Sequence, residues 1–244
     1  MTHLAKITAV EARLLFREPG TWIVGILLPA FVLVVIGLIF GSHETEPGLG
    51  GRRYIDLLAP SMVVISLATL GISTMPARLV KYRELGVLRR LSTTPVEPSA
   101  LLIAQLIINV AVAIGGLLVV IVVGNLAFQV PIPQHIPGFV AAFLLGVSSL
   151  FALGLLVAAV APTSGVANAM IWPIFITVMF LGGVYLPRWL LPEAIVKIGD
   201  FTPPGVQAML DAWLGTAPQL LPLVIMAAIT IVAGTAAARL FRWE

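Results

Sequence analysis

The chain of 244 residues contains no cysteine. Disulfide bonds, thiol catalysis and metal or iron–sulfur sites with cysteine ligands are therefore excluded. Histidine is also scarce, and the three that occur are scattered along the chain, outside the long apolar stretches: His3, His43 and His135. Metal sites and membrane hydrolases need several such groups together. We therefore expect no catalytic residue, no cofactor-binding residue and no metal site in this chain.

Charged residues make up only 10% of the chain, whereas a soluble domain contains about 25%. Hydrophobic residues make up 59%, and the mean hydropathy is +1.08, so the composition indicates an integral membrane protein. The sequence pI near 9.7 could suggest a nucleic-acid partner. The net charge is only +3 and the basic residues lie at the ends of apolar stretches, so orientation in the bilayer explains them better. We expect a lipid bilayer, and no nucleic acid, as the partner.

A phosphate-binding P-loop is missing as well. That motif requires Gly-Lys-Ser/Thr. The chain has three lysines, and each follows alanine or valine instead of glycine: Lys6, Lys81 and Lys197. The chain therefore cannot bind and hydrolyse ATP by that route on its own.

Charge is absent from the interior of six apolar stretches, each long enough to cross the hydrocarbon core. They cover about 21–40, 57–77, 99–124, 138–161, 166–186 and 220–238. The sequence thus predicts an all-α integral membrane protein with six transmembrane helices in a single domain, residues 1–244. An ion-coupled secondary transporter is disfavoured, because such carriers usually bind the coupling ion with buried ionisable groups. A membrane enzyme or assembly factor acting on lipids is disfavoured by the missing catalytic groups.

Two segments next to the spans have a different pattern. Residues 1–20 predict an interfacial helix with an apolar side and a basic side, although Glu11 and Glu18 fall near the apolar side. Residues 187–219 contain five prolines and apolar stretches too short to span, so we expect interfacial or re-entrant helices there. The distribution of basic residues sets the orientation: ten of the fourteen fall on the side of the termini and of residues 78–98. Both termini are therefore predicted to be cytoplasmic, and 187–219 external.

The segment 78–98 carries five of the basic residues between two apolar stretches. Leucines at three-residue spacing predict a short helix with one apolar stripe, and Pro95 ends it. Such a helix could dock into a groove of a cytoplasmic partner. It could equally rest on lipid headgroups, and position alone does not decide between the two.

The same segment resembles the signature loop of ABC-2 type permeases, the membrane subunits of ATP-driven exporters, in which an E-x-G-x-x-R-R-L-x-x-T-P-like run follows the second span. The matching residues are Glu84, Gly86, Arg89, Arg90, Leu91, Thr94 and Pro95. The resemblance extends over the whole chain: 15–19 resembles the family's N-terminal elbow, and 182–187 resembles the end of span five. Residues 201–204, Phe-Thr-Pro-Pro, depart from the family's commoner Asn-Pro. The chain is most similar to the drug and antibiotic exporter branch.

This resemblance implies a coupling helix over 84–95 that docks on a separate nucleotide-binding subunit. The residues expected to couple are Glu84, Leu85, Gly86, Leu88, Arg89, Arg90, Leu91, Thr94 and Pro95. It also implies two copies of that ATPase subunit, with ATP and Mg²⁺ bound there, and a second permease copy or paralogue in the plasma (inner) membrane. The expected cargo is a hydrophobic or amphipathic compound, such as a drug, an antibiotic or a lipid-like molecule, moved outward.

Two helical faces could line the cargo path. The first lies in span two and consists of Met62, Ser66, Thr69 and Ser73, and the second lies in span five and consists of Asn168, Trp172, Phe175 and Met179. Aromatic and methionine surfaces suit varied amphipathic molecules. The alternative for both faces is ordinary helix packing, in which small and hydroxyl residues let helices approach.

Overall fold

Helices make up most of the part of the chain that the structure describes, which comprises residues 3–39, 45–46, 51–92, 99–184, 191–199, 201–203 and 205–241. The elements of this computed structural model are, in order, α1 (His3–Arg17), α2 (Pro19–Trp22), η1 (Ile23–Leu27), α3 (Leu28–Ile39), β1 (Thr45–Glu46), β2 (Arg52–Arg53), α4 (Tyr54–Ala68), η3 (Thr69–Thr74), α5 (Met75–Glu84), α6 (Val87–Ser92), α7 (Ser99–Phe128), α8 (Ile136–Val160), α9 (Ser164–Leu181), α10 (Glu193–Gly199), α11 (Val206–Trp213) and α12 (Leu220–Leu240). The segments η1 and η3 are π-helical and interrupt otherwise continuous helices. The predicted all-helical membrane architecture is confirmed.

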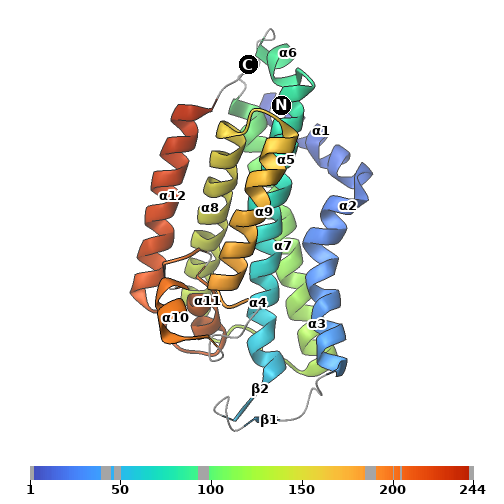
Figure 1. Ribbon diagram of the computed structural model, residues 1–244. Coiled ribbons are helices and arrows are strands. Elements are labelled where there is room, and N and C mark those ends of the chain that lie inside the picture. Colours follow the sequence, from blue (N-terminus) through green and yellow to red (C-terminus); the bar gives the residue numbers. More distant parts are fainter. Residues whose placement is uncertain are drawn as a thin grey trace.

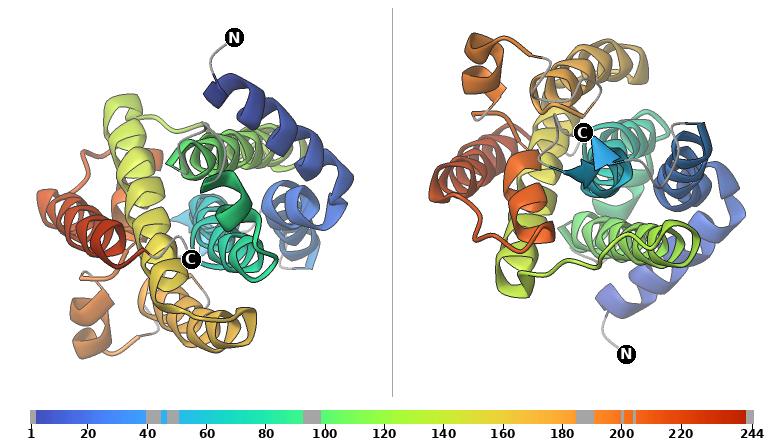
Figure 2. Two further views of the ribbon diagram at one scale, coloured as in Figure 1. Left: turned by 90° about the horizontal axis from the view of Figure 1, so that it is seen from above. Right: turned by 90° about the horizontal axis from the view of Figure 1, so that it is seen from below.

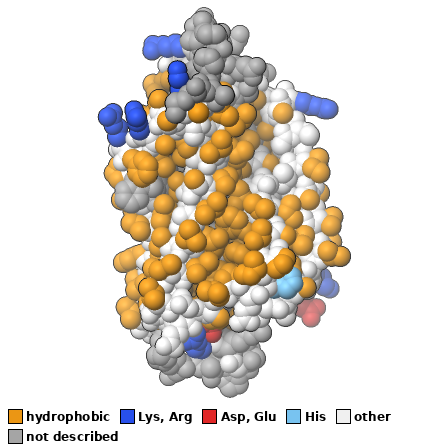
Figure 3. Space-filling model, turned by 180° about the vertical axis from the view of Figure 1, so that it is seen from behind, with side chains coloured by type: hydrophobic (Ala, Val, Ile, Leu, Met, Phe, Trp, Pro, Cys, Tyr) orange, Lys and Arg blue, Asp and Glu red, His pale blue; other side chains and the backbone are white. Residues whose placement is uncertain are grey.

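The long helices run side by side, and their connections lie at the two ends of the bundle (Figure 1). One end carries α6, the start of α1 and the C-terminal end of α12, and the other carries the paired strands β1 and β2 with α10 and α11. Helix α1 lies across the end of the bundle rather than along it (Figure 2). Hydrophobic side chains cover the face seen in Figure 3, and most of the visible lysines and arginines gather near the end with α6. The start of α1, the end of α12 and residues 78–92 thus share one end of the bundle.

Among the described residues, five helices are long and apolar enough to cross a membrane: Tyr54–Glu84, Ala100–Phe128, Ile136–Val160, Ser164–Leu181 and Leu220–Leu240. They correspond to predicted spans two to six. The first predicted span, 21–40, corresponds to the helix from Pro19 to Ile39, whose uninterrupted apolar part, Ile23–Ile39, is shorter. Spans two and three were predicted to end at 77 and 124, where the apolar run stops. Both helices continue beyond that point, because a polar side chain does not end a helix.

The helix from Tyr54 to Glu84, which comprises α4, η3 and α5, is the centre of the bundle. Of the 18-residue apolar segment of this helix, 78% is buried within the protein, whereas only 22% of the corresponding segment of α12 is buried. It packs against α3, α7, α8 and α9. Its 31 residues make it roughly 46 Å long, whereas the hydrocarbon core is about 30 Å thick. The charged last turns, with Arg78, Lys81 and Arg83, therefore extend beyond the hydrocarbon.

Two close helix crossings depend on glycine. Gly154 of α8 lies against Gly71 of η3, and a methyl group at residue 154 would overlap the Gly71 carbonyl oxygen. Gly116 of α7 lies against the Gly25 carbonyl oxygen of η1 and the Ser66 hydroxyl of α4. Ser66 in turn donates a hydrogen bond to that same carbonyl oxygen. These small residues let α7 and α8 pack directly against the π-helical segments.

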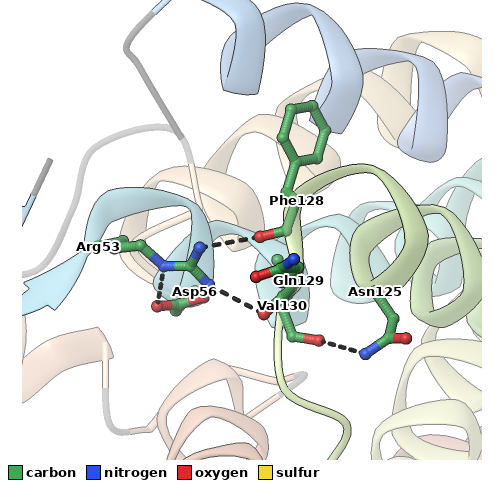
Figure 4. Close-up of polar contacts among 6 residues, drawn as sticks. All are labelled: Arg53, Asp56, Asn125, Phe128, Gln129 and Val130. Carbon is green, nitrogen blue, oxygen red and sulfur yellow. Dashed lines mark hydrogen bonds and ion pairs between the residues drawn. The ribbon is translucent and has the colours of Figure 1, made fainter. Parts of the chain in front are cut away.

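At the end opposite α6, Arg53 holds the start of α4 against the end of α7 (Figure 4). Its guanidinium donates to the two carboxylate oxygens of Asp56, at 3.0 and 2.7 Å. It also donates to the carbonyl oxygens of Phe128 and Gln129, at 2.8 and 3.1 Å. Carbonyl groups at a helix C-terminus lack intrahelical partners and attract a cation. One side chain therefore bridges these two helix ends, which belong to helices that also pack against each other.

Candidate functional site

The loop between the second and third spans begins with a break at Gly86. Helix α5 ends at Glu84, and Gly86 has a φ of 68°. The Gly86 N–H donates to the Arg83 carbonyl oxygen at 2.9 Å, as in a left-handed C-cap, a conformation that glycine adopts readily. Helix α6 then begins at Val87. The prediction of one helix over 84–95 is therefore wrong, and two helices meet at a glycine turn.

This break also divides the predicted leucine stripe. Leu85 is 60% exposed, whereas Leu88 in α6 is 1% exposed. Arg90 is exposed on α6. Only the backbone of Arg89 and Leu91, as part of α6, is described, and the predicted coupling residues Thr94 and Pro95 lie outside the described residues. The coupling role of these residues stays a prediction.

Glu84 is hydrogen-bonded to the first residue of α9. Its Oε1 accepts a hydrogen bond from the Ser164 N–H at 2.7 Å, and its Oε2 accepts one from the Ser164 hydroxyl. The neighbouring Arg83 donates to the carbonyl oxygen of Ala161, just after α8. The last turn of α5 is therefore fastened to the connection between α8 and α9.

A buried acid joins α1 to the same end of the bundle. Glu11 is 5% exposed and accepts hydrogen bonds from the Tyr82 hydroxyl, at 3.1 Å, and from the Gln105 side-chain amide. Burial raises the pKa of the Glu11 carboxyl, against the opposing effects of the Tyr82 hydrogen bond and the nearby Arg78. Arg78 also forms an ion pair with Glu18 at 3.2 Å. Helix α1 is thus connected by polar contacts to both α5 and α7.

An apolar groove of about 520 Å³ lies between α3, the central helix and α9. Five of the residues predicted for the cargo path line it: Met62, Thr69, Ser73, Trp172 and Phe175. The indole of Trp172 and the ring of Phe175 meet edge to face, with centroids 6.2 Å apart. The opposite wall is aliphatic and comes from η1 and α3: Val24, Leu28, Val32 and Ile36. The groove therefore combines aromatic and aliphatic walls with the hydroxyl-bearing residues Tyr54, Thr69 and Ser73.

The other three residues predicted for the cargo path do not line the groove. Ser66 is fully buried in its contact with Gly25, and Met179 is fully buried in the core. Asn168 is exposed. For Ser66 and Met179 the structure shows helix packing, which was the alternative.

Several residues at these sites were not identified from sequence. The aliphatic wall from η1 and α3 gives no signal beyond its hydrophobicity, which lipid-facing residues share. Ser164 gives none either, since nothing local relates it to Glu84. Glu11 differs, because an acid on the apolar side of an amphipathic helix is a signal of a buried polar contact.

Comparison with protein families gave a match to the family described as ABC-2 type transporter, over residues 2–204. The matched segment contains α1, the loop with Glu84 and every residue of the groove. Comparisons with curated proteins and with solved structures gave no match.

Proposed function

Because the chain belongs to the ABC-2 type transporter family, we propose that it is the permease subunit of an ABC exporter. A separate nucleotide-binding subunit, present in two copies, binds ATP and Mg²⁺ and docks on the cytoplasmic side. A second copy of the permease, or a paralogue, completes the transporter in the plasma (inner) membrane. The cargo is a hydrophobic or amphipathic compound such as a drug, an antibiotic or a lipid-like molecule, and it moves outward.

One observation carries this proposal: a single helix lines the groove and ends where the loop begins. Met62, Thr69 and Ser73 line the groove, and the same helix runs on to Glu84 at the end that carries α6. A displacement of α6 by a docked ATPase therefore passes through the turn at Gly86 and then along this helix to the groove.

The lining of the groove supports the proposed cargo class. Aliphatic and aromatic side chains dominate it, and no Asp, Glu, Lys or Arg belongs to its described lining. Its volume of about 520 Å³ falls within the range of small-molecule sites, about 300–1,000 Å³. Such a lining favours compounds with a large apolar surface over ions and sugars.

The position of the groove supports a second permease copy. Trp172 is 61% exposed and Leu28 is 42% exposed, and these two residues lie on opposite walls. The groove thus faces outward from one bundle, and a second bundle placed against this face encloses it. The two halves then form one cargo chamber with access from the cytoplasmic side.

Cysteine labelling tests the orientation, because the chain has no cysteine of its own. Arg90→Cys in α6 should react with an impermeant maleimide only after the cells are opened. Ile132→Cys is the matched control, since Ile132 is 56% exposed in the connection between α7 and α8, at the opposite end, and it should react in intact cells. Labelling of residue 90 in intact cells would overturn the proposal.

A reconstituted transporter tests the energy source. With its ATPase subunit in proteoliposomes, the permease should accumulate a fluorescent lipophilic compound only when ATP is hydrolysed. Arg90→Glu should abolish cargo-stimulated ATP hydrolysis, whereas Arg13→Glu, exposed on α1, should preserve it. Transport driven by an ion gradient without ATP would support the secondary-transporter alternative. A lipid-modifying activity without transport would support the enzyme alternative.

A further inference from the structure

We propose that Glu84 is a positioning residue that latches the end of α5 to α9, so that the central helix and α9, which form two of the three sides of the groove, move together. This inference rests on the proposed function and deepens it. It assigns to Glu84 a contact within the permease, in place of the contact with the ATPase subunit that the family resemblance implied.

The geometry of the latch is that of a carboxylate at a helix N-terminus. Ser164 is the first residue of α9, and its N–H is one of the groups that lack an intrahelical acceptor. Glu84 supplies that acceptor with one oxygen and binds the Ser164 hydroxyl with the other. A negative charge at this position also interacts favourably with the helix dipole. Both carboxylate oxygens therefore have partners within the chain.

Arg83 provides a second attachment next to the first. It donates to the Ala161 carbonyl oxygen, which lies three residues before Ser164. Two adjacent side chains at the end of α5 thus hold the short connection between α8 and α9. Further along α5 and α9 the two helices pack against each other, so the latch closes one end of a continuous contact.

The effect of the latch on the groove depends on which helix forms each side of the groove. The central helix carries Thr69 and Ser73, and α9 carries Trp172 and Phe175. A force on α6 reaches the central helix through the backbone of the turn at Gly86. It reaches α9 at the same end through Glu84 and Arg83. With the latch, the central helix and α9 move together relative to η1 and α3, which form the third side of the groove. Without the latch, α9 stays behind, and less of the groove lining moves for each cycle of ATP hydrolysis.

The test compares Ser164→Ala with Thr163→Ala in the reconstituted complex. Ser164→Ala removes the hydroxyl group that donates a hydrogen bond to Glu84. Thr163→Ala is the matched control, because its hydroxyl caps the same helix by accepting from the Val166 N–H at 3.3 Å without touching Glu84. Three quantities are measured: co-purification of the ATPase subunit, ATP hydrolysis, and cargo transported per ATP hydrolysed.

We expect the ATPase subunit to co-purify with every variant, while cargo transported per ATP falls about tenfold in Glu84→Ala, within the usual range of coupling between sites. Ser164→Ala should show a smaller loss, because the N–H bond to Glu84 remains, and Ser164→Thr should restore coupling by restoring the hydroxyl. Thr163→Ala should stay near the wild type.

Three results would contradict the latch. Loss of the ATPase subunit from Glu84→Ala would make Glu84 a partner contact, and the proposed function would stand. An equal loss of coupling in Thr163→Ala and Ser164→Ala would show only that any weakening of the start of α9 impairs transport. Wild-type coupling in Ser164→Ala and Glu84→Ala would show that the contact does not contribute to coupling. If no ATPase subunit binds the wild-type chain, the proposed function itself fails.

Discussion

Glu11 is a carboxyl group held between α1, α5 and α7, and its surroundings make this end of the molecule sensitive to pH. The groups around it are Tyr82 and Gln105, which donate hydrogen bonds, and the charged Arg78 and Glu18. The dominant effect is burial, which disfavours the carboxylate and raises the pKa of Glu11 above its ordinary value of 4.5. The folded protein therefore holds this proton to a higher pH than the unfolded chain does.

The sign of the pH dependence follows from proton binding. Between pH 4.5 and the raised pKa the folded state binds more protons, so its stability falls as pH rises through that window. Glu11→Gln cannot ionise and keeps an oxygen that accepts from Tyr82 and Gln105. The melting temperature in detergent should therefore fall less steeply from pH 4.5 to pH 7.5 in Glu11→Gln than in the wild type. Glu193→Gln, at an exposed residue at the opposite end, should keep the wild-type slope, and identical slopes for all three proteins would rule out this account.

The sequence alone correctly predicted some residues of the groove and misplaced others. Helical spacing placed Met62, Thr69 and Ser73 on one face, and they do line one groove. The same spacing included Ser66, which turns out to bond to Gly25 across a helix crossing. Spacing gives the face of a helix, but it does not say which neighbour covers that face. That information comes from packing between segments distant in sequence.

At the scale of elements, the apolar runs located the spans but not their ends. Charged side chains mark where the hydrocarbon core ends, whereas a helix ends where its backbone leaves the helical conformation. The central helix shows the difference, since it continues past Arg78 to the glycine turn at residue 86. The break itself was not predicted, because a glycine within a helical pattern is often tolerated and its φ is not written in the sequence. Treating 84–95 as one helix followed from that.

The glycine turn gives a prediction for the two helices that it separates. Alanine at residue 86 must adopt the left-handed conformation, which costs about 1–2 kcal/mol, although no atom lies within 4 Å of the added methyl group. Gly86→Ala should therefore lower the free energy of unfolding by about 1 kcal/mol or extend α5 into α6. Gly234→Ala in α12, where the space is also open and the backbone is helical, should instead stabilise by roughly 0.5–1 kcal/mol. Chemical unfolding in detergent measures both changes, and equal effects would show that the turn at residue 86 is not required.

At the scale of the whole molecule, the contacts made by charged side chains in the described part of the chain lie at the two ends of the bundle, and the groove lies between them. Arg53 bridges the start of α4 and the end of α7 at one end, and Glu11 and Glu84 join helices at the other. Between these attachments the helices meet mainly through small and apolar side chains, with the hydrogen bond from Ser66 to Gly25 at one crossing, and such contacts allow sliding and rotation more readily than buried ion pairs do. This arrangement suits a permease in which movements at one end of the bundle change the shape of the groove between its ends.

The assembly of two such bundles gives the last prediction. Trp172 beside the groove and Val232 on α12 are exposed to similar extents, 61% and 66%, but they lie on different helices of the bundle. If a second copy covers the groove, Trp172→Cys should give dimers with a short bismaleimide in membranes, whereas Val232→Cys should be labelled without forming dimers. The chain has no native cysteine, so any covalent dimer reports the introduced residue. Dimers from Val232→Cys alone would place the interface on α12, and a paralogue partner would form a heterodimer with Trp172→Cys once a cysteine is also introduced into that partner. Labelling of Trp172→Cys without any cross-linked partner would leave the groove facing lipid, and the two-bundle chamber would have to be abandoned.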